Sequence, residues 1–156
     1  RLALLSPFIN VLPMKAMIGL IKVPGVGDYI GRVALDRINI NYPQKVFANT
    51  SAIPAEYTDR YMEQLSYRGF KHARLSNLRG DSLADFTAEY ETVGRSSVPV
   101  LLTWGTADIV IRSDSVAGIK KAMPKLEYHE IPGGGHLVHY ESPEKVNGVL
   151  VKFLKR

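Results

Sequence analysis

The sequence predicts an α/β fold in which a buried parallel sheet carries a long helical insertion. Three short apolar runs bounded by turn residues are typical of buried parallel strands: residues 2–5, 98–104 and, more weakly, 126–131. Between the second and third runs, Val116, Ile119 and Met123 recur at helical spacing before Pro124. Residues 113–123 therefore complete a strand-helix-strand unit.

The stretch between the first two strands, residues 8–94, favours short helices over further strands. Prolines and glycines interrupt it repeatedly, and its apolar residues do not form the β-α alternation seen later in the chain. Tyr57, Tyr61 and Leu65 mark one helix, and residues 83–93 mark another that ends at Gly94. An insertion between parallel strands lies on the side of their carboxyl ends, where α/β folds keep their active sites. We therefore expect a helical lid over an apolar pocket.

The chain closes on a turn and a final helix. The turn is Pro132 to Gly135, and Ser142 with Pro143 supplies an N-cap and a first helical residue for the helix that follows. At the other end, the first strand starts at residue 2, with nothing before it to pair with or cover it. A buried strand in that position leads us to expect further sheet and helices upstream, in the same protein.

Composition excludes several classes of protein. The 156 residues contain no Cys, which excludes disulfide scaffolds, thiolate metal sites and cysteine nucleophiles. The net charge is +5, but the basic residues are scattered, so we expect no nucleic-acid partner. Lys and Pro interrupt the longest apolar stretch, residues 8–26, so we expect no membrane span. Without a visible sorting signal, the default location is the cytoplasm.

Two polar residues follow neighbouring strands of the predicted sheet. Asp108 follows the second strand through residues 105–107, and His136 follows the third strand. Because the carboxyl ends of adjacent parallel strands meet at one edge, we expect the two side chains within hydrogen-bond reach. An acid that holds an imidazole in the right tautomer suits general-base chemistry. From spacing alone, Asp108 could also be a turn residue and His136 a loop residue bonded to backbone groups.

Three segments resemble the closing third of α/β-hydrolases: VPVLLTWGTAD at residues 98–108, GGHL at 134–137 and ESPE at 141–144. The resemblance implies the C-terminal part of an α/β-hydrolase fold, with Asp108 as catalytic acid and His136 as catalytic base, in the family's chain order of nucleophile, acid and histidine. It also implies a core strand at residues 1–7, a helical cap at 8–94 and the closing part of the core at 95–156.

The family's nucleophile is missing from this chain. It lies on a Gly-x-Ser-x-Gly elbow upstream of the strand that resembles residues 2–5, and no such elbow occurs here. Ser82, in Gly80-Asp-Ser82-Leu-Ala84, is the nearest match. No apolar strand precedes Ser82, so a helix N-cap is the simpler interpretation of it. We expect this chain alone to be nearly inactive in acyl transfer.

A metal site is the main alternative for the histidine segment. His136, His139 and Glu141 lie close in sequence, but the i,i+3 spacing and the preceding glycines do not suit a helical metal pair. We expect Glu141 to order the loop as a hydrogen-bond acceptor, His139 to lie on the surface, and neither metal nor cofactor to be required. His72 and His129 show no convergent partners.

The leading functional hypothesis is hydrolysis of a small apolar ester-type substrate through a covalent acyl intermediate. An upstream Ser would attack, His136 would move its proton and Asp108 would orient His136. An upstream Asp nucleophile would instead give a dehalogenase or epoxide hydrolase, and a Ser enzyme of this fold could hydrolyse a carbon–carbon bond. A non-catalytic assembly module, with an exposed sheet edge, is the alternative from a different class. The oligomeric state is not predicted.

Overall fold

The computed structural model describes residues 1–9, 15–80 and 84–156, without the side chains of residues 15–18 and 35–38. Internal contacts divide the chain into two compact units. The first, called the sheet unit, comprises Arg1–Ile9, Gln44–Ala52 and Phe86–Arg156, and the second, called the helical unit, comprises Asn10–Pro43 and Ile53–Asp85. Ser82 lies outside the described residues.

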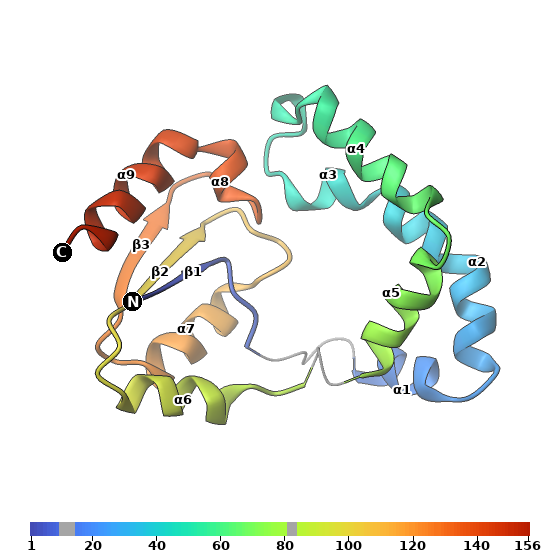
Figure 1. The fold of residues 1–156 in the computed structure, drawn as a ribbon, viewed down its shortest axis with the longest axis horizontal. Coiled ribbons are helices and arrows are strands. Elements are labelled where there is room, and N and C mark those ends of the chain that lie inside the picture. Colours follow the sequence, from blue (N-terminus) through green and yellow to red (C-terminus); the bar gives the residue numbers. More distant parts are fainter. Residues whose placement is uncertain (10–14, 81–83) are drawn as a thin grey trace. The chain divides into compact units, whose positions relative to one another are not determined.

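Three parallel strands form the sheet, in the order β1-β2-β3 (Figure 1). Their bounds are Leu2–Leu5, Val100–Gly105 and Glu127–Ile131, which confirms the three predicted strands. β2 begins two residues later than predicted, because Pro99 has no N–H to donate to a neighbouring strand. β3 begins one residue later, because the N–H of Leu126 donates to the Met123 carbonyl in a turn.

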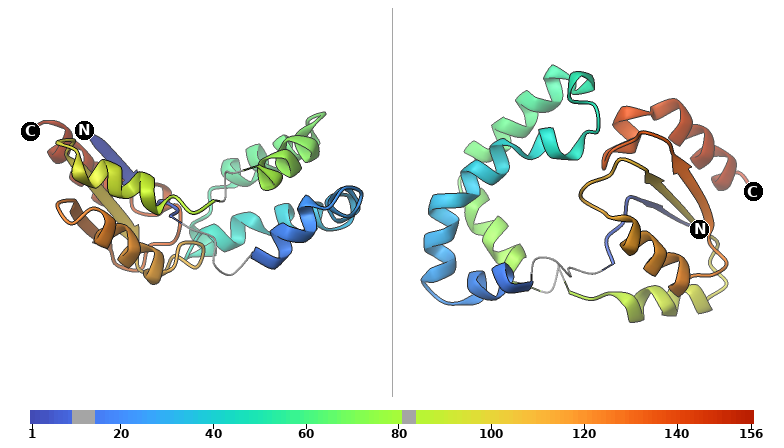
Figure 2. Two further views of the ribbon diagram at one scale, coloured as in Figure 1. Left: turned by 90° about the horizontal axis from the view of Figure 1, so that it is seen from below. Right: turned by 180° about the vertical axis from the view of Figure 1, so that it is seen from behind.

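Helices cover both faces of the sheet (Figure 1 and Figure 2). α6 (Thr87–Arg95) and α7 (Ser113–Ala122) cover one face, and α8 (Val138–Glu141) and α9 (Pro143–Leu154) cover the other. All six residues of β2 are buried, as expected for the central strand of a sheet covered on both sides. Val100, Leu102 and Trp104 pack in the cluster beneath α7, whereas Ile131 packs with Val138 and Val146 on the opposite face.

The end of the chain follows the predicted plan with one addition. α9 begins at Pro143 after Ser142, as predicted, although the Ser142 side chain makes no capping hydrogen bond. The short helix α8 was not predicted; it lies between His136 and α9. Its N-terminal residue Val138 is fully buried, which anchors the segment after His136 to the sheet.

The helical unit contains α1 (Lys15–Lys22), α2 (Val26–Ile40), α4 (Ala55–Ser66) and α5 (Phe70–Arg79). Ile21 and Leu75 are its buried core, and Gly31 of α2 lies against the Leu75 side chain of α5, where an added Cβ would be 2.5 Å from Cδ1. Arg79 links α5 to α1 and α2. Its Nε donates to the Ile21 carbonyl at 3.0 Å, and its guanidinium forms an ion pair with Asp28 at 3.1 Å.

The described part of residues 8–94 contains helices and no strand, but residues 8–9 and 86–94 pack with the sheet unit and not with the helical unit. There are two further elements, α3 (Tyr42–Val46) and the 3-10 helix η1 (Thr50–Ala52). The end of α3 and the whole of η1 lie in residues 44–52, which belong to the sheet unit. The function of the helical unit as a lid stays a prediction. Across the described ranges, no helix has the length and apolar character that crossing a bilayer requires.

Candidate active site

The loop after β2 buries the carboxylate of Asp108. The Asp108 side chain is 0% exposed, and its Oδ1 accepts hydrogen bonds from the backbone N–H groups of Val110 and Ile111, both at 2.8 Å. This is the turn geometry that an Asp stabilises by binding N–H groups two or three residues ahead. Trp104 Nε1 donates to the Ile111 carbonyl at 2.9 Å and fixes the far end of the loop. The Asp108 side chain therefore has one orientation.

His136 meets the second oxygen of that carboxylate. His136 Nδ1 lies 3.0 Å from Asp108 Oδ2, and the imidazole is 19% exposed. When the ring is neutral and Nδ1 donates this bond, Nε2 keeps the free lone pair of a general base. The structure thus brings together the two residues that the sequence placed at this edge of the sheet.

Glycines allow the two loops to touch. A Cβ at Gly105 would collide with the carbonyl oxygens of Gly134 and Gly135. Across the same contact, the N–H of Ala107 donates to the Gly134 carbonyl at 2.9 Å, and the N–H of Gly133 donates to Thr106 Oγ1 at 2.9 Å. The acid loop and the histidine loop are therefore one bonded assembly, and the Asp108–His136 distance depends on it.

A segment distant in sequence supports the histidine loop from its other side. The N–H groups of His136 and Leu137 both donate to the Val46 carbonyl, at 2.9 and 3.2 Å. Glu141 accepts from Gly135 N–H at 2.9 Å and from Ala48 N–H at 3.0 Å. The predicted role of Glu141 as a loop-ordering acceptor is confirmed. The role of Val46 was not predicted, because residues 44–52 were assigned to the insertion.

The remaining strand also delivers a polar group to this edge of the sheet. Ser6 directly follows β1, and its N–H donates to the Thr103 carbonyl at 2.9 Å. It is 5% exposed, its φ is +44°, and its hydroxyl has no hydrogen-bond partner in the described structure. A left-handed conformation and a buried unpaired hydroxyl are both unfavourable, and residues of this kind cluster at functional sites. Sequence reasoning missed Ser6, whose only signal was its place after a strand.

The other candidates of the histidine segment do not form a metal centre. Asp108 occupies His136 Nδ1, and Glu141 is engaged by backbone N–H groups. His139 is exposed, as predicted, and its pKa is lowered first by desolvation and then by the nearby His136. Within the described ranges, no three His, Cys, Asp or Glu side chains converge as metal ligands.

The prediction for His129 was wrong, because this residue does have a partner. His129 Nε2 lies 2.8 Å from Glu127 Oε1, and Arg156 binds the same carboxylate at 2.6 Å. Glu127 and His129 are two positions apart on β3, so both side chains project from the same face of the sheet. Glu127 and His129 thus lie on the strand itself and not in the loop that carries His136.

Comparison with known proteins agrees with this architecture. The profile of the family described as alpha/beta hydrolase fold matches residues 25–143. No curated protein matches the chain.

Three solved structures of similar fold share 16 to 17% of their residues with this chain. A variant of the meta-cleavage product hydrolase from Pseudomonas fluorescens IP01, in complex with acetates, gives a TM-score of 0.74 at 17% identity, covering 99% of this chain and 55% of that one. An α/β-hydrolase from a Medee basin deep-sea metagenome gives 0.71 at 16%, with 100% and 56% covered. An esterase from Thermogutta terrifontis gives 0.71 at 16%, with 98% and 54%. At these identities the likeness shows the fold alone, and the chain spans about half the length of these proteins.

Proposed function

Because the chain belongs to the alpha/beta hydrolase fold family, we propose that Asp108 and His136 are the acid and base of a nucleophile-acid-histidine triad. The reaction is hydrolysis of a small apolar ester-type substrate. The nucleophile, a Ser in the leading version, comes from residues outside this chain.

One observation carries the proposal: the 3.0 Å contact between His136 Nδ1 and an Asp108 carboxylate that is fully buried and bound by two backbone N–H groups. A turn Asp would serve its own loop only, and a loop histidine would bind backbone groups through its ring. Here Asp108 uses Oδ1 for the loop and presents Oδ2 to the imidazole. That division of the two oxygens supports a positioning role for the acid.

The proton follows a short route in this mechanism. His136 Nε2 takes the proton of the attacking hydroxyl, and the imidazolium that forms is stabilised by the carboxylate at Nδ1. The same proton then passes from Nε2 to the leaving alcohol, and a water repeats the cycle to release the acid. Asp108 stays ionised throughout. The donors for the oxyanion come mostly from outside this chain, as does the nucleophile.

The helical unit, as part of a cap over residues 8–94, is proposed to shape the apolar substrate pocket and to exclude water from it. The apolar positions of α2 and α5 that are not used in the Ile21–Leu75 core would supply that lining. Substrate size then depends on the helical unit, and the proton transfers depend on the sheet unit.

Hydrolysis of a carbon–carbon bond is the second candidate. The fold is compatible with it, because a meta-cleavage product hydrolase has a similar fold over almost the whole of this chain. Both reactions use an acid and a histidine in the same places, so Asp108 and His136 keep their roles. Parallel assays with p-nitrophenyl butyrate and with a meta-cleavage product separate the two.

The test of the triad uses the polypeptide extended upstream so that it includes the nucleophile. Asp108→Asn and His136→Ala should each lower kcat for ester hydrolysis by roughly 10³ to 10⁴. Asp114→Asn and His72→Ala, which change exposed residues of the same types, should leave kcat within about twofold. Retention of activity in His136→Ala would exclude the triad.

A second test uses the 156-residue chain and needs no substrate. A proton on His136 Nδ1 that is bonded to a buried carboxylate resonates far downfield in proton NMR spectra. The signal should be present in the chain, should persist in His72→Ala, and should disappear in Asp108→Asn. A spectrum in which Asp108→Asn keeps the signal would show that the proton belongs to another histidine.

A further inference from the structure

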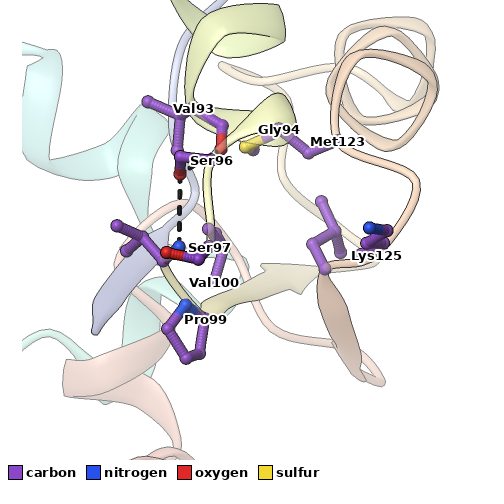
Figure 3. A pocket seen from close by; sticks show the side chains of 10 residues that line it. Val93, Gly94, Ser96, Ser97, Pro99, Val100, Met123 and Lys125 are labelled. Carbon is purple, nitrogen blue, oxygen red and sulfur yellow. Dashed lines mark hydrogen bonds between the residues drawn. The ribbon is translucent and has the colours of Figure 1, made fainter.

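A hollow of about 290 Å³ lies at the end of the sheet opposite to Asp108 and His136 (Figure 3). It is formed by the end of α6, the loop that enters β2 and the loop that enters β3. β2 has six residues, so its two ends are roughly 16 Å apart at about 3.3 Å per residue. The hollow is therefore separate from the candidate active site and close to the lower limit of size for a small-molecule pocket.

The lining of this hollow is mostly apolar and has a single charge. Val93, Val98, Met123 and Leu126 supply the apolar surface, and Lys125 is the only ionisable side chain among the lining residues. Ser97 and Lys125 lie on either side of the hollow in the view of Figure 3. The hydroxyl of the neighbouring Ser96 is already used, because it donates to the Val93 carbonyl at 2.6 Å and accepts from Val98 N–H at 3.2 Å.

The charges around Lys125 add to its positive potential. Lys125 also borders a second hollow, of about 240 Å³, which is lined by Arg1, Arg156 and Glu127 as well. Glu127 is engaged by Arg156 at 2.6 Å and by His129 at 2.8 Å, so the carboxylate is satisfied by its own partners. Lys125 has no acidic partner among the described residues. A cation beside an apolar hollow attracts an anion that has an apolar body.

We propose that the hollow between α6, β2 and β3 binds a small organic carboxylate, whose charged group lies at Lys125 and whose apolar body lies against Val98, Met123 and Leu126. A volume of about 290 Å³ is enough for an acid of medium chain length. The site needs neither the nucleophile nor the Asp108–His136 pair, so it stands independently of the proposed function.

The experiment titrates the 156-residue chain with octanoate and follows backbone amide shifts. The amides of residues 96–100 and 123–126 should move in one saturable process, while those of residues 108 and 136 stay in place. Two compounds test the role of the carboxylate: octanol has no charge, and octylamine has a positive charge in its place. Octanol should bind about three- to fivefold more weakly than octanoate, because a partly exposed ion pair contributes up to about that factor, and octylamine should bind more weakly still.

Three variants decide the assignment. Lys125→Gln should weaken octanoate about three- to fivefold, and Val98→Asp, at a side chain that is 44% exposed, should abolish binding by placing a carboxylate in the hollow. Lys145→Gln, on an exposed lysine that lines neither hollow, is the matched control and should bind as the parent does. Because both charge variants change exposed residues, their amide spectra should show that the fold is kept.

Two results would overturn the proposal. One is octanoate affinity that is the same in Lys125→Gln and Val98→Asp as in the parent chain. The other is binding that moves the amides of residues 108 and 136 and is lost in His136→Ala, which would place the ligand at the candidate active site. Failure of the triad experiments with intact octanoate binding would leave this site standing, so the two proposals fail separately.

Discussion

At the scale of single residues, the candidate site is defined by how each polar atom is used. Asp108 divides its two oxygens between its own loop and His136, and Glu141 divides its two oxygens between Gly135 and residues 48–49. Glu141 therefore acts on the site by holding the backbone that carries His136. It is a positioning residue and does not touch the imidazole of His136 in the described contacts.

Ser6 differs from these residues, because its buried hydroxyl has no hydrogen-bond partner among the described residues. This difference yields a prediction about stability. Ser6→Gly should stabilise the chain by about 1 to 2 kcal/mol, because it removes a Cβ from a left-handed conformation and an unpaired hydroxyl from the interior, against a smaller entropic cost of glycine. Ser6→Ala keeps the Cβ and should gain less. Urea unfolding of the chain measures both. A loss of stability in Ser6→Gly would mean that the hydroxyl has a partner after all.

At the scale of elements, two loops and a helix end determine the geometry. Gly105 ends β2 where the histidine loop crosses it. Gly105→Ala should destabilise the chain by about 3 kcal/mol or more, because the added Cβ meets two carbonyl oxygens and the loops must separate. Gly148→Ala, in the open on α9, is the matched control and should stabilise by about 0.5 to 1 kcal/mol. Urea unfolding midpoints compare the two.

Separation of the acid loop from the histidine loop should also change an NMR signal that a general loss of stability would not change. In Gly105→Ala at low temperature, where the chain is still folded, the downfield proton assigned to His136 should weaken or disappear. In Gly148→Ala it should stay. A Gly105→Ala chain that kept the full signal would show that the Asp108–His136 pair does not depend on the contact between the loops.

Glu127 and His129 on β3, together with Arg156 beyond the end of α9, make stability depend on pH. The hydrogen bond from His129, together with Arg156, holds the pKa of Glu127 below its ordinary value of 4.5, although desolvation opposes the shift. A carboxyl whose folded pKa is lowered contributes stability above its unfolded pKa and loses it as the pH falls through the folded pKa. The contribution should therefore disappear below about pH 4.5.

The test compares melting temperatures of the chain and of Glu127→Gln between pH 3 and pH 7. This range lies on both sides of the ordinary pKa of Glu. The difference between the two proteins should be largest near neutral pH and should shrink as the pH falls below the ordinary value. Glu144→Gln, an exposed residue at the start of α9, is the control. A constant difference over the whole range would show that Glu127 does not titrate with a lowered pKa.

At the scale of the whole molecule, the chain divides into two units, and the residues to which we assign proton transfer lie in one of them. The sheet unit contains both members of the Asp108–His136 pair and every loop that holds them. We expect the 156-residue chain alone to form this pair and yet to hydrolyse p-nitrophenyl butyrate no faster than His136→Ala, because the proposed nucleophile lies outside residues 1–156. Upstream extension should restore turnover, measured by release of p-nitrophenolate. Turnover by the chain alone, lost in His136→Ala, would mean that a nucleophile is present within residues 1–156.

Local sequence patterns predicted much of this architecture. Apolar runs bounded by turn residues located the strands, most clearly β2, because a strand buried on both faces is largely apolar; β3, which carries Glu127 and His129, gave the weakest pattern. Helical spacing and Pro124 located α7, and Pro143 located the start of α9. The pairing of Asp108 with His136 followed from topology: adjacent parallel strands deliver the residues after them to the same edge.

Other features depend on contacts between residues that are remote in sequence, and no local pattern encodes these. The Val46 carbonyl supports His136 across 90 positions of sequence, and the partner of Gly105 is a loop that begins after the next strand. The conformation of Ser6 and the pairing of His129 with Glu127 likewise depend on backbone and side-chain geometry. The sequence by itself determined which elements form and which side chains reach the edge of the sheet, because burial and strand order are local or topological. Only the tertiary structure decided what holds those side chains in place, because a hydrogen bond requires two groups to meet in space.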